Sequence, residues 1–167
     1  AKALNVALNA SNAGDVQAAS KGTTNIEAYN LVLRGNYFYW RFDNGDDARA
    51  IDQFQQAVKL DPHYALAWAK LARVYAYQGY AGELTSAEAI AKGRDAAERA
   101  LAIDPKCAEA YLARGYLFEV NAGDWMAAKS DYKRAVALDP HAEVGEDAQS
   151  NILDLEAEMS GRFDELF

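Results

Sequence analysis

Apolar residues recur every three or four positions along most of this chain, which is the spacing of amphipathic α-helices. The first two predicted helices span residues 25–42 and 47–60. Their apolar faces consist of Ala28, Leu31, Gly35 and Phe38, and of Ala50, Ile51, Phe54, Ala57 and Val58. The same spacing continues almost to the end of the chain, so the pattern predicts an all-α fold.

A short motif, in which two aliphatic residues flank a variable one and are followed by Asp and Pro, ends three of the predicted helices. It occurs at residues 58–62, 101–105 and 136–140. Asp is a favoured N-cap and Pro a favoured first helical residue. We therefore expect Asp61, Asp104 and Asp139 to cap the next helices. The aliphatic side chain before each Asp should be buried under the corner.

The prolines of this motif are 43 and then 35 residues apart, and such periods are typical of helical repeat arrays. The longer interval places extra residues between Tyr77 and Ala97, as longer helices or as a protruding loop. Residues 85–88, Thr-Ser-Ala-Glu, predict a capping box there. Gly161 is expected to end the last long helix, and residues 162–167 to begin another.

These signals predict two parts of the chain. Residues 1–24 read as a short N-terminal helix followed by a linker, either capping the array or belonging to a preceding domain. Residues 25–167 read as the array, with units at about 25–62, 63–105 and 106–140 and an incomplete fourth at 141–167. Because the chain starts without Met and stops within a predicted helix, we expect a fragment of a longer protein.

Composition and charge narrow the function. The net charge is −8, and residues 141–167 hold eight acidic residues against one basic residue. No basic stripe predicts nucleic-acid binding, and no apolar stretch predicts a membrane contact, so a cytoplasmic and a periplasmic location both fit. His63 and His141 lack ligand spacing, Cys107 is the single cysteine, and no phosphate loop is present. We therefore expect no metal, no cofactor and no catalysis.

The repeated pattern resembles the tetratricopeptide repeat, which has a large apolar residue, a small residue and an aromatic in its first helix, then Ala, an aromatic, Ala and a closing Pro. The first unit supplies Leu31, Gly35, Phe38, Ala50, Phe54, Ala57 and Pro62. The second supplies Trp68, Ala72, Tyr75, Ala97, Ala100 and Pro105, and the third Tyr111, Gly115, Phe118, Ala128, Tyr132, Ala135 and Pro140. Arg34 and Arg114 stand where the pattern usually has Leu. The resemblance implies a right-handed superhelical array of antiparallel helix pairs, an α-solenoid.

Three shorter stretches have a finer resemblance. Residues 28–37, 124–128 and 161–165 are similar to repeats of bacterial adenylate-cyclase-like and winged-helix regulatory proteins. That resemblance implies a signalling role within a larger bacterial regulatory protein.

In such arrays the first helix of each pair lines the concave side, which implies a peptide-binding groove. The groove residues implied here are Tyr29, Asn36, Tyr39, Trp40, Arg73, Tyr77, Tyr116 and Glu119. They form an aromatic groove with Asn36 and Arg73 as polar anchors, although several aromatics could instead pack between repeats.

Some tetratricopeptide domains bind a C-terminal carboxylate through a clamp of Lys, Asn and Arg. Asn36 holds one clamp position, whereas Val32, Leu112 and Tyr116 hold others. The clamp is therefore expected to be absent, and a single pair between Arg73 and a carboxylate stays open.

The leading hypothesis is a non-catalytic scaffold that binds a protein or peptide of unknown identity. The alternative is self-association, a homo-oligomer formed through an apolar stripe around Phe163, Leu166 and Phe167.

Overall fold

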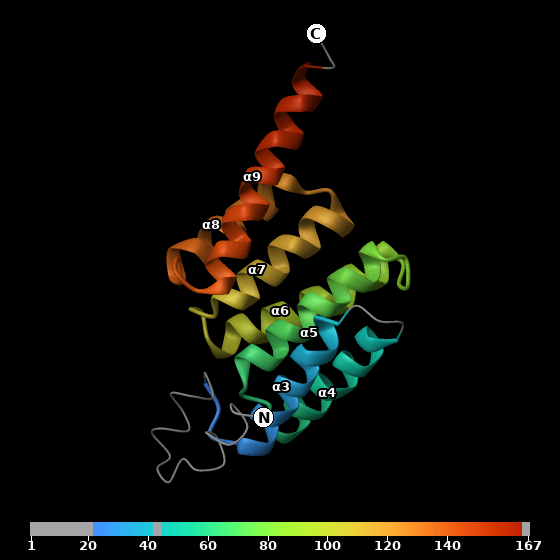
Figure 1. Ribbon diagram of the computed structural model, residues 1–167, viewed down its shortest axis with the longest axis vertical. Helices are drawn as coiled ribbons and strands as arrows, with labels where there is room; N and C mark the ends of the chain where they lie inside the picture. The colour runs from blue at the N-terminus through green and yellow to red at the C-terminus, as the bar shows by residue number, and fades with distance from the viewer. Residues whose placement is uncertain (1–21, 42–44, 165–167) are drawn as a thin grey trace.

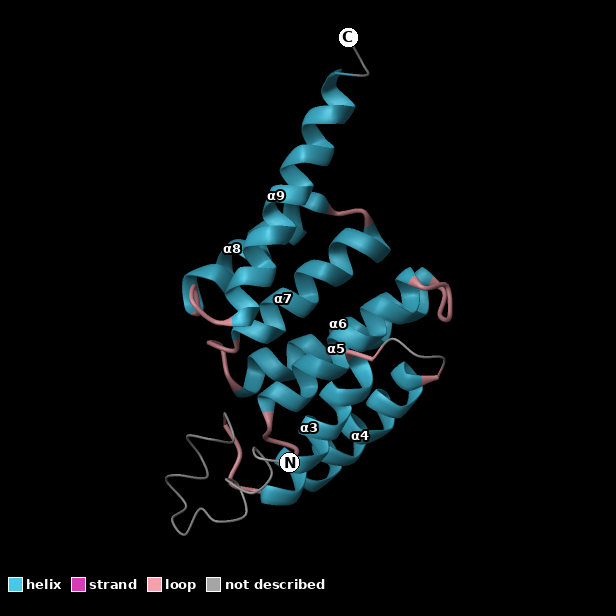
Figure 2. Ribbon diagram, viewed as in Figure 1, coloured by secondary structure: helices cyan, strands magenta, loops and turns pink. Residues whose placement is uncertain are grey.

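The computed structural model describes residues 22–41 and 45–164. In these residues the order is α3 (Ile26–Tyr39), α4 (Asp46–Leu60), α5 (Ala65–Tyr80), α6 (Ser86–Ile103), α7 (Ala108–Leu117), the π-helical turn η1 (Phe118–Ala122), α8 (Trp125–Leu138) and α9 (Glu143–Asp164). Antiparallel helices stack one pair on the next from α3 to α9 (Figure 1), and the described part contains no strand (Figure 2). The predicted all-α solenoid is confirmed.

Side-chain caps begin three of the helices. Asn25 Oδ1 accepts from the backbone N–H of Ala28, at 3.0 Å, at the start of α3. Thr85 and Glu88 form the predicted capping box at the start of α6. Asp124 Oδ1 accepts from the Ala127 N–H before α8. Each cap satisfies a backbone donor that the first turn of a helix leaves free, so these boundaries follow from the local sequence.

The Asp-Pro corners differ from the prediction. Asp61 is the C-cap of α4 and not the N-cap of α5, which begins three residues after Pro62. The Asp61 carbonyl accepts from the Tyr64 N–H at 3.1 Å, and its Oδ1 accepts from the His63 N–H at 3.0 Å. Asp104 makes the same two bonds to its own corner. At these two corners the Asp-Pro pair therefore forms a β-turn with Pro at the second position, because the chain must first reverse direction between antiparallel helices. Asp139 is likewise the C-cap of the preceding helix, α8.

The aliphatic residue before the corner is also not uniformly buried. Leu60 is 44% exposed, whereas Ile103 and Leu138 are half-buried. The predicted burial of Leu60 is therefore wrong.

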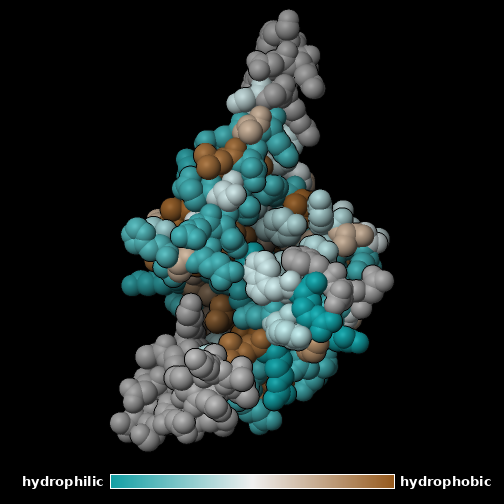
Figure 3. Space-filling view, in the orientation of Figure 1, coloured by the Kyte–Doolittle hydropathy of each residue, from teal (hydrophilic) through white to brown (hydrophobic). Residues whose placement is uncertain are grey.

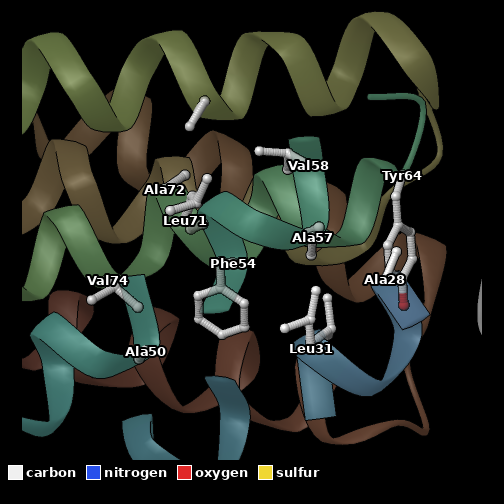
Figure 4. Close-up of a cluster of buried hydrophobic side chains, with 14 of the residues drawn as sticks. Ala28, Leu31, Ala50, Phe54, Ala57, Val58, Tyr64, Leu71, Ala72 and Val74 are labelled. Atoms are coloured by element: carbon white, nitrogen blue, oxygen red, sulfur yellow. The ribbon is translucent and has the colours of Figure 1, made fainter. Parts of the chain in front are cut away.

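Helices within a pair approach closely where glycine faces a ring. A Cβ atom added to Gly35 on α3 would lie 2.4 Å from Cε1 of Phe54 on α4. A Cβ atom added to Gly115 on α7 would lie 2.6 Å from Cε1 of Tyr132 on α8. Figure 4 shows the Phe54 ring surrounded by small and aliphatic side chains of the core. Glycine at these two positions is required by packing, as the repeat pattern predicted.

The irregular second unit has longer helices and not a protruding loop. Its helices α5 and α6 have 16 and 18 residues, whereas α3 and α4 have 14 and 15. Gly82, at φ 78°, lies in the short connection between α5 and α6. Of the two alternatives, the structure shows the first.

The last helix continues past its predicted end. α9 runs for 22 residues through Gly161 to Asp164, so the predicted break is wrong. A glycine inside a helix costs only about 1 kcal/mol relative to Ala, and Gly161 is not followed by the Asp that helps turn the chain at Gly45 and Gly123. The C-terminal half of α9 projects beyond the other helices (Figure 1).

Two further expectations lie outside the described residues. These are the N-terminal helix with most of its linker, in residues 1–21, and the final residues 165–167. Among the described helices, none is both long and apolar enough to cross a membrane. The face shown in Figure 3 is mostly hydrophilic, with separate hydrophobic spots.

Candidate binding groove

A groove of about 630 Å³ runs along the first helices of the successive pairs. Side chains of α3, α5 and α7, the first residues of α9, and the turns before α5, α7 and α9 line it. Its apolar lining includes Val32, Leu66 and Val144, one from each of three different helices. The first helices thus line a common hollow, as expected for the concave side of an array of helix pairs.

An ion-pair network crosses the middle of this groove. Glu109 on α7 accepts from two cations of α5, Lys70 Nζ at 3.0 Å and Arg73 Nη1 at 3.2 Å. The second terminal nitrogen of Arg73, Nη2, lies 2.8 Å from Asp147 Oδ2 on α9. Both cationic side chains are 14% exposed. The network joins the first helices of three consecutive units.

Burial and charge act in opposite directions on Glu109. Burial raises the pKa of this carboxyl group, but the positive charges of Lys70 and Arg73 lower it by more than burial raises it. The resulting pKa is about 2. The pKa of Arg73 is raised: burial opposes its charge, and the carboxylates of Glu109 and Asp147 more than compensate. Glu109 and Arg73 are therefore both ionised at neutral pH, and charge-assisted hydrogen bonds hold the network together.

Two aromatic rings lie against the guanidinium of Arg73. Its guanidinium lies 5.6 Å from the centre of the Tyr39 ring and 5.3 Å from that of Trp40, within cation–π range. The Tyr39 ring contacts those of Trp40 and Tyr77 edge to face, with centroids 5.2 and 6.2 Å away. Burial raises the pKa of Tyr39, and the nearby Arg73 partly offsets it. These rings hold Arg73 in place as well as presenting a surface.

The structure brings most of the predicted groove residues to this region. Tyr29, Asn36 and Arg73 line the groove itself. Tyr39, Trp40 and Tyr77 form the aromatic cluster around Arg73. Tyr39 and Tyr77 are half-buried and Trp40 is exposed.

The other two predicted residues lie on α7 and η1. Burial raises the pKa of Tyr116 to about 12, with Tyr39 and Tyr80 as neighbours. Glu119, in η1, accepts a hydrogen bond from the hydroxyl of Tyr132 on α8. Its carboxylate is thereby tied to the contact between α7 and α8.

Asn36 offers an acceptor in the groove. Its Oδ1 is buried and receives no hydrogen bond from the residues that the structure describes. Buried amide oxygens usually have a donor, so an unpaired oxygen at this position is unusual. The expected role of Asn36 as a polar anchor stays a prediction.

Sequence reasoning missed Lys70 and Asp147 as parts of the site. Lys70 precedes Arg73 by one helical turn, so the i, i+3 spacing of two cations on a groove-facing helix could have indicated it. Asp147 gave no such signal, because its position depends on how α9 packs against the preceding pair.

The nucleophilic and metal-binding residue types do not assemble into a site here. Burial raises the pKa of the Cys107 thiol to about 11, so it stays protonated and packs as a small apolar side chain. His63 and His141 are exposed. Within residues 22–41 and 45–164, no three His, Cys, Asp or Glu side chains are grouped as a metal site would require.

The family model of the tetratricopeptide repeat matches residues 41–79, which include α4 and nearly all of α5. The chain contains a tetratricopeptide repeat. The matched segment pairs the second helix of one unit with the first helix of the next, so it includes one of the Asp-Pro turns. The earlier identification of the repeat is confirmed in this segment.

Solved tetratricopeptide domains share the fold. The first such domain of human RPAP3 is 20% identical, with a TM-score of 0.62 over 83% of this chain and 96% of that one. The first domain of Spaghetti (RPAP3), bound to the HSP90 peptide SRMEEVD, is 20% identical, with a TM-score of 0.58 over 80% and 94%. The Arabidopsis OM64 domain is also 20% identical, with a TM-score of 0.56 over 77% and 95%. No curated protein matches the sequence significantly. At this identity the likeness shows the fold alone.

Proposed function

We propose that the chain is a non-catalytic scaffold that binds a protein or peptide segment in the groove of its tetratricopeptide array. The observation that carries this proposal is the groove of about 630 Å³, lined by the first helices of successive units. Ligand sites of this kind are hollows with apolar walls and a few polar groups that fix orientation. Asn36 and the Arg73 network supply such polar groups beside the apolar wall.

The structural relatives support the proposal. The Spaghetti domain is described as bound to a peptide of HSP90. The proposed site here consists of Tyr29, Asn36, Tyr39, Trp40, Arg73, Tyr77, Tyr116 and Glu119. Lys70, Glu109 and Asp147 are neighbours of Arg73 in its ion-pair network.

A display selection with a random peptide library on the immobilised chain tests the proposal. Peptides that the selection enriches are then measured by calorimetry against two variants. In Asn36→Trp a large ring fills the groove, whereas Gln56→Trp places the same ring on the exposed face of α4. We expect Asn36→Trp to weaken binding about tenfold or more and Gln56→Trp to leave it unchanged.

Two results would count against the groove. One is equal binding of the selected peptides by both variants, and the other is a selection that enriches nothing. Circular dichroism of Asn36→Trp shows whether its helices are intact, and a smaller substitution, Asn36→Leu, replaces it if they are not.

The wider context is a second part of the proposal. The similarity of residues 28–37 and 124–128 to repeats of bacterial adenylate-cyclase-like and winged-helix proteins supports a place in a larger bacterial regulatory protein that takes part in signalling. Sequencing the complete gene tests it. A signalling or DNA-binding domain on the same chain is the expected result, and an unrelated enzyme domain would contradict it.

Self-association is the alternative function. Leu153 on α9 is 58% exposed and Met126 on α8 is 70% exposed, both in the last helices of the array. Apolar residues at the end of a solenoid favour stacking on another copy. Sedimentation velocity across a range of concentrations distinguishes this alternative, because a strict monomer at every concentration excludes it.

A further inference from the structure

The two cations in the middle of the groove are already held by carboxylates of the chain itself. Lys70 and Arg73 share Glu109, and Arg73 also binds Asp147. This set of two cations and two carboxylates is neutral. A ligand carboxylate that binds the terminal nitrogens of Arg73 has to displace Asp147 or Glu109, and breaking either ion pair leaves a charge without its partner.

The other charged groups of the groove are mostly acidic. Its lining adds the carboxylates of Asp104, Asp139 and Glu143 and the ammonium group of Lys106. Asp139 and Glu143 lie at the turn from α8 to α9 and pair with no cation among the described residues. Carboxylates beside a hollow attract cations more strongly than in open water, because the low-dielectric walls reduce screening.

The excess of negative charge continues beyond the groove. Residues 141–167 hold eight acidic residues and one basic residue, and α9 carries most of them. A ligand that approaches the α8–α9 end of the groove therefore meets a negative field.

We propose that the groove binds a basic segment of a partner protein. Its Lys or Arg side chains lie beside Asp139 and Glu143, and its apolar side chains lie against Val32, Leu66 and Val144. This inference rests on the proposed function and adds the charge of the ligand. The volume of about 630 Å³ falls within the usual range of ligand sites, roughly 300–1,000 Å³, and takes a few residues of an extended peptide.

The proposal distinguishes this groove from that of a structural relative. The peptide bound by the Spaghetti domain, SRMEEVD, is acidic and would bring further carboxylates to a groove whose cations are already paired. We therefore expect the acidic peptide to bind this chain weakly.

Fluorescence anisotropy with four labelled peptides tests the charge preference. Three matched peptides share the same apolar residues and carry lysine, glutamine or glutamate at their polar positions, and the fourth is SRMEEVD. The lysine peptide should bind about tenfold or more tightly than the glutamate peptide, and added salt should weaken it. Equal or tighter binding of either acidic peptide would overturn the inference.

A matched pair of variants separates the groove from the overall charge of the chain. Glu143→Gln and Glu98→Gln each remove one carboxylate, but Glu98 is exposed on α6 and does not line the groove. Binding of the lysine peptide should fall about three- to fivefold in Glu143→Gln and stay unchanged in Glu98→Gln. Equal losses in the two variants would show attraction by net charge alone and would overturn the inference.

The Asn36→Trp variant keeps failure of this inference separate from failure of the proposed function. If library-selected peptides are lost in Asn36→Trp but the lysine peptide does not bind, only the charge assignment is wrong. If Asn36→Trp weakens the binding of no peptide that binds the wild-type chain, the groove itself is not the binding surface.

Discussion

The first and third helix pairs share one packing contact but surround it with different chemistry. In the first pair Phe54 fills the space that Gly35 leaves, within a cluster of buried apolar residues that spans α3 to α7. In the third pair Tyr132 does the same at Gly115, within a smaller cluster on α7, α8 and α9.

A hydrogen bond and an ion pair add to the packing contact in the third pair. The Tyr132 hydroxyl donates to Glu119, and Arg114 binds the largely buried Asp131 through two hydrogen bonds of 2.7 and 2.8 Å. Arg114 stands where the repeat usually has Leu, so this position makes an ion pair and not the usual apolar contact. In the first pair the buried Asp46 also binds arginines, but it lies at the corner between α3 and α4 and not between their packed faces. Where the apolar cluster is small, directional bonds help to fix how the helices pack.

The largest expected effect comes from removing the two rings. Phe54→Ala should lower the free energy of unfolding by about 3–5 kcal/mol, because the ring is fully buried and leaves a cavity. Tyr132→Ala should cost at least as much despite its smaller cluster, since it also leaves Glu119 without its donor. Urea unfolding followed by circular dichroism measures both. If Tyr132→Ala lowers the free energy of unfolding by less than half as much as Phe54→Ala does, the hydrogen bond and ion pair of the third pair add little.

Acid should weaken the α5–α7–α9 network in particular. The pKa of Glu109 is about 2 in the folded chain, below its ordinary value of 4.5. A lowered pKa stabilises the fold above the ordinary value, and this stabilisation is lost as the pH falls from about 4.5 towards 2. The loss is on the order of 3 kcal/mol. Lys70, Arg73 and Asp147 are the other charged groups of this network.

The variant Glu109→Gln isolates that contribution. Its unfolding free energy should lie below that of the wild type at pH 6, and the two values should converge as the pH falls to about 2. Urea titrations at several pH values provide the measurement. Parallel curves for the two proteins would mean that Glu109 is not the group that titrates.

The repeat pattern predicted the helices and their close contacts because it records local propensity and packing. Gly35 and Phe54 lie on predicted apolar faces, and Thr85 begins a helix through bonds within four residues. The Asp-Pro turn was misplaced because Asp favours both N-caps and turns, and only the direction of the next helix decides between them. The Arg73 network depends on contacts between residues up to 74 positions apart, which helical spacing does not contain.

The glycines at the two contacts provide a more specific test of the comparison. Gly35→Ala and Gly115→Ala place a methyl group 2.4 and 2.6 Å from a buried ring. Each substitution should therefore lower the free energy of unfolding by about 1–3 kcal/mol. Gly93→Ala is the matched control on α6, where the new methyl group would meet Leu117 methyl groups at 3.0 and 3.1 Å. Its better helix propensity, up to about 1 kcal/mol, should offset that contact. Thermal unfolding of the three variants measures the difference, and a similar loss in Gly93→Ala would show that the rings are not the cause.

The smallest expected effect comes from Tyr132→Phe, which makes the Gly115–Tyr132 contact of the third pair resemble the Gly35–Phe54 contact of the first. Tyr132→Phe keeps the ring and removes only the hydroxyl bound to Glu119, so the expected loss at pH 7 is about 1 kcal/mol. Tyr111→Phe is the control, because its hydroxyl makes a longer, exposed bond of 3.3 Å to the Pro105 carbonyl. Its loss should stay below about 0.5 kcal/mol.

The pH dependence of Tyr132→Phe identifies the origin of its loss. Burial raises the pKa of Glu119, and the Tyr132 hydroxyl lowers it by stabilising the carboxylate. Without that hydroxyl the pKa rises further, so the added penalty applies to the charged form and disappears as the pH falls below the folded pKa. The deficit of Tyr132→Phe measured by urea unfolding should therefore shrink between pH 7 and pH 4. A deficit that is the same at both pH values would assign the effect to packing, and the first and third contacts would then differ in composition but not in how they hold their helices.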